Sequence, residues 1–208
     1  MQTPKAPSYV WSESAGRYRN TATGRFVPER VVLREVDKVY AASAQTMKGL
    51  TQSLVDGDLS LPEWQRAMEA QIKMVNRIGG VAARGGLDQM TQADWGHVGA
   101  QTKRQYQYFR NFAAEIASGK QKLNGTAVTR AGLYGEAGRG TYQEGKRRQA
   151  KRKGYNEERR MLGFAEHCPD CVKYAQRGWQ PIGTLPRIGD SQCRTYCKCF
   201  FTYRTREE

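Results

Sequence analysis

Apolar residues recur at spacings of three and four along much of the chain, which is the pattern of amphipathic helices. The first such stretch runs from about Pro28 to Leu54, and the sequence Asp56-Gly57-Asp58 ends it. We therefore expect a long helix here with one buried face. That face comprises Val32, Val36, Val39, Tyr40, Ser43, Met47, Leu50 and Leu54.

Two further helices have clear starting signals. Ser60-Leu61-Pro62-Glu63 reads as a capping box with proline in the first turn, and Thr91-Gln92-Ala93-Asp94 is a second capping box. We expect the first of these helices to be broken or bent at Gly79-Gly80 and Gly85-Gly86, and the second to extend to about Ala117. Their buried faces would comprise Leu61, Trp64, Met68, Ile72 and Val75, and Phe109, Phe112, Ala113 and Ile116.

A glycine-rich helix follows a linker at 119–125. It starts after Thr126 and includes Val128, Leu133 and Tyr142, but four glycines interrupt it. Because glycine weakens a helix interior, this segment is either one long, locally frayed helix or two pieces.

Residues 1–30 are polar and rich in turn formers. Tyr18 and Phe26 flank an Asn-Thr-Ala-Thr-Gly stretch that could form a short hairpin. We interpret the segment instead as an extended arm that orders against a partner, and a solvated flexible tail is the alternative.

Composition limits the kind of protein this can be. The 208 residues are 38% hydrophobic, with a mean hydropathy of −0.77, which indicates a modest core or an elongated shape completed by neighbours. The net charge of +14 and a pI of about 9.8 favour a polyanionic partner. We find no apolar run that could cross a membrane and no signal peptide, so we expect no membrane partner and a reducing setting.

The positive charge is most concentrated from Lys146 to Arg160, where eight basic residues accompany two acidic ones. Such a surface would bind nucleic acid through phosphates without reading sequence. The alternative is a solvated helical face. The candidate contacts to nucleic acid or an acidic partner are Lys146, Arg147, Arg148, Lys151, Arg152 and Lys153.

All of the cysteines lie near the C-terminal end, at Cys168, Cys171, Cys193, Cys197 and Cys199. A Cys-x2-Cys pair, 21 intervening residues and then Cys-x3-Cys-x-Cys are close to the spacing of a structural zinc site. Thiolates are soft anionic ligands, and two tight turns can direct four of them at one Zn²⁺. The predicted module is a small β-hairpin held by zinc.

Two other interpretations of the cysteines remain open. Disulfides are disfavoured by the odd count and the lack of a secretory signal. A redox Cys-x2-Cys would normally follow a strand in a βαβ unit, and none precedes it. For zinc, Cys168 and Cys171 are the firmest ligands, and two of Cys193, Cys197 and Cys199 would complete the set. His167 could substitute for one of them, but we interpret it as a polar neighbour of the Cys-x2-Cys pair.

Catalytic patterns are missing from the sequence. His97 has no evident nucleophile beside it, and His167 adjoins the predicted zinc site. We find no phosphate-binding loop or His-Glu-x2-His. Four protein ligands would also leave a zinc ion no open position for chemistry. We therefore predict that the protein is not an enzyme and has no small-molecule substrate.

The C-terminal constellation resembles a known family. Cys168-Pro-Asp-Cys171, the turn Gly178-Trp-Gln-Pro-Ile-Gly183 and Cys197-Lys-Cys199 are similar to the ending of the minor head proteins of tailed phages, the head-morphogenesis proteins related to the Mu F protein. In that family the second cluster is His-Pro-x-Cys-Arg-Cys. Here Cys193 lies near the position of the histidine but one residue further out, so the resemblance does not assign the fourth ligand. Looser likeness extends over about 50–203.

The resemblance implies a virion component inside the head or at the portal vertex, assembled in the host cytoplasm. Its implied partners are the portal or major capsid protein, with genomic DNA as a further contact, and its role would be head assembly, DNA packaging or ejection. The alternative is a zinc-stabilised protein that binds nucleic acid without sequence specificity.

The expected fold is mainly α, an elongated helical body with a small zinc-stapled hairpin module. We expect an N-terminal arm over 1–30, the helical body with its basic segment over 31–160, and the cysteine-rich module over 161–208.

Overall fold

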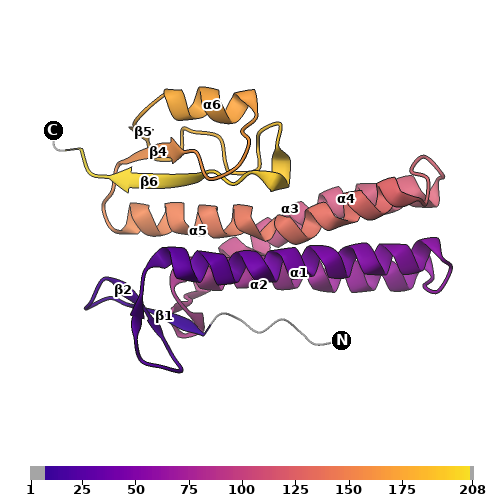
Figure 1. Cartoon of the computed structure of the whole chain (residues 1–208), viewed down its shortest axis with the longest axis horizontal. Helices are drawn as coiled ribbons and strands as arrows, with labels where there is room; N and C mark the ends of the chain where they lie inside the picture. Colours follow the sequence, from indigo (N-terminus) through magenta and orange to yellow (C-terminus); the bar gives the residue numbers. More distant parts are fainter. Residues whose placement is uncertain (1–7, 207–208) are drawn as a thin grey trace.

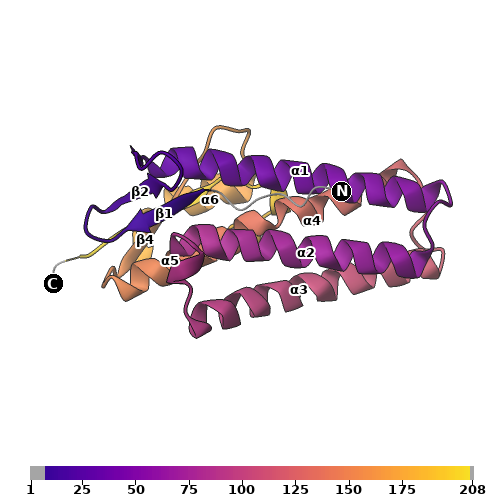
Figure 2. The ribbon, with the colours of Figure 1, turned by 90° about the horizontal axis from the view of Figure 1, so that it is seen from below.

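The computed structural model describes residues 8–206 and shows a mainly helical protein. Three long helices, α1 (Glu29–Val55), α2 (Leu61–Arg84) and α3 (Gln92–Ala117), run alongside one another (Figure 2). Helix α4 (Gly125–Glu136) packs on α1, and α5 (Gly138–Arg152) packs on α2. The body is elongated, as the sequence indicated (Figure 1).

The helix boundaries confirm the capping signals. The backbone amide of Ser60 donates to the Glu63 carboxylate at 2.9 Å, and Thr91 forms the same reciprocal pair with Asp94. Helix α2 ends at Gly85, whose φ of 101° lies in the left-handed region that a residue with a Cβ rarely adopts.

The expected break at Gly79-Gly80 was wrong, because α2 continues through both residues to Arg84. A Cβ on Gly79 would lie 2.6 Å from the Gly138 carbonyl oxygen, and one on Gly80 would overlap the side chain of Val98. These glycines therefore allow close packing of α2 against α5 and α3 rather than ending the helix.

The glycine-rich helix consists of two pieces, one of the two outcomes left open. Helices α4 and α5 meet at Ala137, and α5 extends through the basic segment to Arg152. In Figure 1, α5 lies between the long helices and the C-terminal module.

The N-terminal segment corrects the prediction of an arm. Strands β1 (Tyr9–Ser12), β2 (Arg17–Asn20) and β3 (Phe26–Val27) form an antiparallel sheet, including the hairpin treated as the lesser alternative. Tyr18 is 2% exposed and its hydroxyl donates to the Ala82 carbonyl at 3.3 Å. Its aromatic side chain packs against the helices, which anchors a segment too polar to be identified as core. Residues 1–7 of the predicted arm lie outside the described part.

The C-terminal module contains a three-stranded antiparallel sheet in the order β5-β4-β6. Its central strand β4 (Glu157–Met161) lies before the cysteines, while β5 (Gln180–Pro181) and β6 (Phe200–Arg204) lie on either side of it. Helix α6 (Pro169–Gln176) covers this sheet (Figure 1). The module thus begins before residue 161, and it is a sheet with a helix rather than a hairpin, because β6 pairs with β4 across the whole cysteine region.

The buried apolar residues form three clusters. One, around Trp64, Phe109 and Phe112, lies where α1 to α4 meet, and a second, around Tyr40 and Val75, lies under the N-terminal sheet. The third comprises Cys171, Leu185, Ile188, Cys197, Cys199 and Phe201 inside the module. None of the helices in residues 8–206 is both apolar enough and long enough to cross a bilayer.

Candidate metal centre

The cysteines approach one another from three short segments of the module. Cys168 is the N-cap of α6, and Pro169 follows it in the first turn, where proline fits. Cys171 is the third residue of α6, also in its first turn, and is fully buried. Cys193 and Cys197 flank the short 3-10 helix η2 (Arg194–Tyr196), and Cys199 directly precedes β6.

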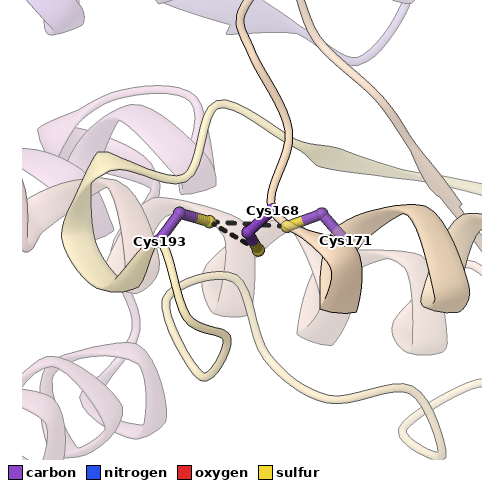
Figure 3. A group of neighbouring side chains, drawn as sticks. All are labelled: Cys168, Cys171 and Cys193. Carbon is purple, nitrogen blue, oxygen red and sulfur yellow. Dashed lines mark hydrogen bonds between the residues drawn. The ribbon is translucent and has the colours of Figure 1, made fainter.

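The five sulfurs form two groups of three that share Cys171. Cys168, Cys171 and Cys193 form one group (Figure 3), and Cys171, Cys197 and Cys199 form the other. The Sγ atoms within each group lie within 4.8 Å of one another. The Sγ of Cys193 lies 3.5 Å from that of Cys168 and 3.4 Å from that of Cys171. Cys171 Sγ lies 3.6 Å from Cys197 Sγ. All five cysteines predicted to be near a metal are therefore brought together.

These separations fit a tetrahedral thiolate site. A Zn–S bond of about 2.3 Å places two sulfurs of a tetrahedron about 3.8 Å apart. The Sγ–Sγ distances of the pairs Cys168–Cys193, Cys171–Cys193 and Cys171–Cys197 are within a few tenths of an ångström of that value. The residues thus fit a soft metal ion such as Zn²⁺, and the cluster could hold a metal ion.

Disulfide bonds are not formed among these residues. All five cysteines are free, and the Sγ–Sγ separation of 3.4 Å between Cys171 and Cys193 far exceeds the bond length of about 2.05 Å. His167 lies at the edge of the cluster as a polar neighbour. Its Nδ1 is 3.8 Å from Cys199 Sγ, while its Nε2 contacts the Gly163 carbonyl oxygen at 2.8 Å.

The surroundings lower the pKa of some of these thiols and raise the pKa of others. Burial opposes ionisation of Cys168, but hydrogen bonds from the backbone of Cys171 and Cys193 outweigh it and lower the Cys168 pKa to about 7. A hydrogen bond from the Cys199 thiol and the nearby Arg160 guanidinium hold the pKa of Cys197 well below its ordinary value. The same Cys199–Cys197 hydrogen bond favours the protonated form of Cys199, so its pKa is raised.

The basic segment is only partly available to a partner, which corrects the prediction for two of its residues. Arg147 is 5% exposed, and Lys146 forms an ion pair with Glu29 at 2.9 Å. Both face inward because α5 lies between the body and the module. Arg152 is exposed but pairs with Asp94 at 2.6 Å. Arg148, Lys151 and Lys153 are exposed, as expected of contact residues.

Sequence reasoning missed a buried ionic network that joins α5 to the module. The Arg147 guanidinium lies 2.8 Å from Glu158 on β4 and 2.9 Å from Glu144, and it also donates to the Leu185 carbonyl at 3.1 Å. Glu158 is completely buried. The only sequence signal was the pair of acidic residues within an otherwise basic run. This network fixes the sheet that carries the cysteines against the helical body.

A cleft of about 590 Å³ separates α3 from the module, and arginines line it. Most of them have carboxylate partners: Arg104 pairs with Asp190 at 3.1 Å, and Arg187 with Glu144 at 3.5 Å. The charges in the cleft are thus largely balanced within the protein, and it offers no chemistry comparable to that of the cysteine cluster.

Comparison of the chain with protein-family models, curated proteins and solved structures finds no match.

Proposed function

We propose that the protein is a structural minor head protein of a tailed phage whose C-terminal module is held together by Zn²⁺. The observation that carries the zinc part is the cluster of five free cysteines in the C-terminal module, of which Cys171, Cys197 and Cys199 are buried. The phage part is supported by the resemblance of Cys168-Pro-Asp-Cys171 and Cys197-Lys-Cys199 to the ending of the Mu F-like proteins.

Zinc would replace the core that this module lacks. Its buried apolar side chains other than the cysteines are Leu185, Ile188 and Phe201, too few to stabilise a separate fold. Thiolates of Cys168, Cys171 and their neighbours would bind the ion, which joins α6 to the segment before β6. When bound, the metal supplies cross-links rather than chemistry, because a closed four-ligand site leaves no position for a substrate.

The proposed partners are the portal or the major capsid protein, with genomic DNA as a further contact in the head interior. The long, exposed outer faces of α1 and α3 would serve as rigid docking surfaces. Enzymatic activity is not part of this proposal.

The virion assignment is tested by peptide mass spectrometry of purified, nuclease-treated phage particles from the source. We expect peptides of this chain at a low but fixed ratio to portal peptides, because a minor head protein is assembled stoichiometrically. Portal peptides serve as the internal control. Particles rich in portal and capsid peptides but lacking this chain would reject the assignment.

A second candidate is direct binding of nucleic acid by the exposed side of α5. Arg148 and Lys151 are exposed, and within residues 8–206 neither has a carboxylate partner within 4.0 Å. Free cations of this kind would contact phosphates without reading bases.

For this second candidate we expect the double variant Arg148→Ala, Lys151→Ala to weaken duplex DNA binding and to reduce the slope of log K against log salt by about 2. Salt-titrated fluorescence anisotropy measures this slope. The matched control is Lys120→Ala, Lys122→Ala, which removes two exposed lysines from the α3–α4 loop. Equal losses in both variants would indicate only a general charge effect and would remove α5 as the binding surface.

A further inference from the structure

A buried arginine lies among the cysteines without an acidic partner. Arg160 on β4 is 1% exposed, whereas its neighbour Arg159 is exposed, because successive side chains of a strand point to opposite faces. Arg160 pairs in register with Phe201 on β6, so it faces the sulfurs rather than solvent. Within residues 8–206, no carboxylate oxygen lies within 4.0 Å of its guanidinium.

The guanidinium donates instead to the cysteine cluster. Its Nη2 lies 3.3 Å from Cys197 Sγ and 3.6 Å from Cys171 Sγ. Ser191 Oγ is a further contact of Nη2 at 3.5 Å, and Nη1 donates to the Pro186 carbonyl at 3.1 Å. The rings of Tyr174 and Phe201 lie 5.2 and 5.9 Å away and hold the guanidinium in place.

Burying an unpaired guanidinium is strongly unfavourable, so a compensating negative charge is required nearby. The sulfurs of Cys171 and Cys197 are the groups in its reach that can carry such a charge. Zinc bound by four thiolates carries a net charge of about −2, which is equally unfavourable in a buried site. One arginine at the sulfurs therefore offsets both penalties at once, and its N–H groups satisfy the sulfur lone pairs.

We propose that Arg160 is the positioning residue of the metal centre, and that it selects Cys168, Cys171, Cys193 and Cys197 as ligands while Cys199 stays outside the coordination sphere. The inference rests on the proposed zinc site. The four selected sulfurs form a continuous series of contacts at 3.4 to 3.6 Å. Arg160 contacts two of them, including Cys171, the member common to both groups of three. Cys199 belongs only to the second group of three, with Cys171 and Cys197, and its sulfur also lies 3.8 Å from the His167 imidazole.

The competing assignment makes Cys199 a ligand and Arg160 a filler of the module core. The two assignments predict that different variants lose the metal ion. If Arg160 positions the ligands, removing its N–H groups weakens metal binding even when the module stays folded, and removing the Cys199 sulfur does not. If Arg160 only fills space, metal affinity follows the cysteines alone.

The test measures Co²⁺ and Zn²⁺ affinity of the full chain by competition with a chelator, together with the thiolate-to-cobalt charge-transfer band and circular dichroism. Outer-shell partners of a metal typically change affinity by about 10- to 100-fold, and we expect that loss for Arg160→Gln. Arg159→Gln, one residue away on the exposed face, is the matched control and should bind as the unaltered chain does. Cys199→Ser should keep one metal ion and an unchanged band, whereas Cys197→Ser should lose both.

Arg160→Lys distinguishes positioning from folding. It keeps the charge but not the planar fork, so we expect an affinity between those of the unaltered chain and Arg160→Gln. If Arg160→Gln does not fold, the metal affinity of Arg160→Lys alone tests the proposal. An Arg160→Lys or a folded Arg160→Gln protein with unaltered affinity would overturn the proposal, as would loss of metal from Cys199→Ser. An unaltered chain that binds no zinc would instead reject the proposed zinc site, which is a separate result.

Discussion

Replacing Cys171 with serine is expected to abolish metal binding and to unfold the C-terminal module while the helical body stays folded. Cys171 is the sulfur most central to the cluster, since it belongs to both groups of three and is fully buried. A hydroxyl is a far poorer ligand for a soft ion than a thiolate. Structural zinc supplies about 10–16 kcal/mol of apparent binding free energy in small zinc modules at neutral pH.

The expected result is best measured residue by residue with amide hydrogen exchange and metal analysis. Amides of β4 and β6 should exchange at least about 100-fold faster in Cys171→Ser, because a loss of about 3 kcal/mol of local stability has that effect. Amides of α1 and α2 should be unchanged, since their cores do not include the cysteines.

The matched control is Val172→Ser, the next residue on α6, which is 36% exposed and supplies no ligand atom to either group of sulfurs. It should retain the metal and the protection of β4. Treatment of the unaltered chain with a strong chelator should reproduce the Cys171→Ser pattern. If Cys171→Ser keeps both zinc and protected β4 amides, the metal centre is not what holds the module.

The second large effect is expected at Gly135, where α4 crosses α1. A Cβ at Gly135 would lie 2.5 Å from the Ala44 Cα, a contact with backbone that no rotamer change relieves. Gly135→Ala should therefore destabilise the protein by about 3 kcal/mol and lower Tm by about 6–12 °C. Thermal unfolding followed by circular dichroism checks this, with a denaturant titration for the free energy of unfolding.

Gly99→Ala serves as the opposite control on α3. Gly99 is exposed, and a Cβ there would have no atom within 4 Å. This variant should be stabilised by up to about 1 kcal/mol, because alanine favours a helix over glycine. If Gly135→Ala raised the free energy of unfolding as Gly99→Ala is expected to, helices α1 and α4 would not approach each other as closely as described.

The helices could be predicted because their signals are local. The Ser60–Glu63 and Thr91–Asp94 capping boxes lie within four residues, and the stripe of Trp64, Met68 and Ile72 is buried as its spacing predicts. The error at Gly79 has a physical cause that no local pattern contains. A side chain at Gly79 would collide with the backbone of Gly138, which lies about sixty residues away in sequence.

The central strand of the module could not have been found from hydrophobic alternation. The inward side chains of β4, Glu158 and Arg160, are charged, and they are satisfied by Arg147 and by cysteine sulfurs from distant segments. A sequence pattern records polarity but not pairing, so this strand reads as part of a charged surface. The cysteine cluster, in contrast, could be predicted because its spacing alone indicates convergence on a metal.

The pairing of β4 with β6 limits how this module could be exchanged between genes. Recombination that joined a foreign cysteine region after residue 161 would leave the new β6 to pair with a strand of different origin. A crossover in the turn around Gly154 would transfer the whole sheet intact. Even then the incoming β4 must bring an acid at the position of Glu158, because the resident α5 already presents a buried Arg147 that requires one. Strand β4, the cysteine region and the Glu158 carboxylate opposite Arg147 would therefore have to be inherited together.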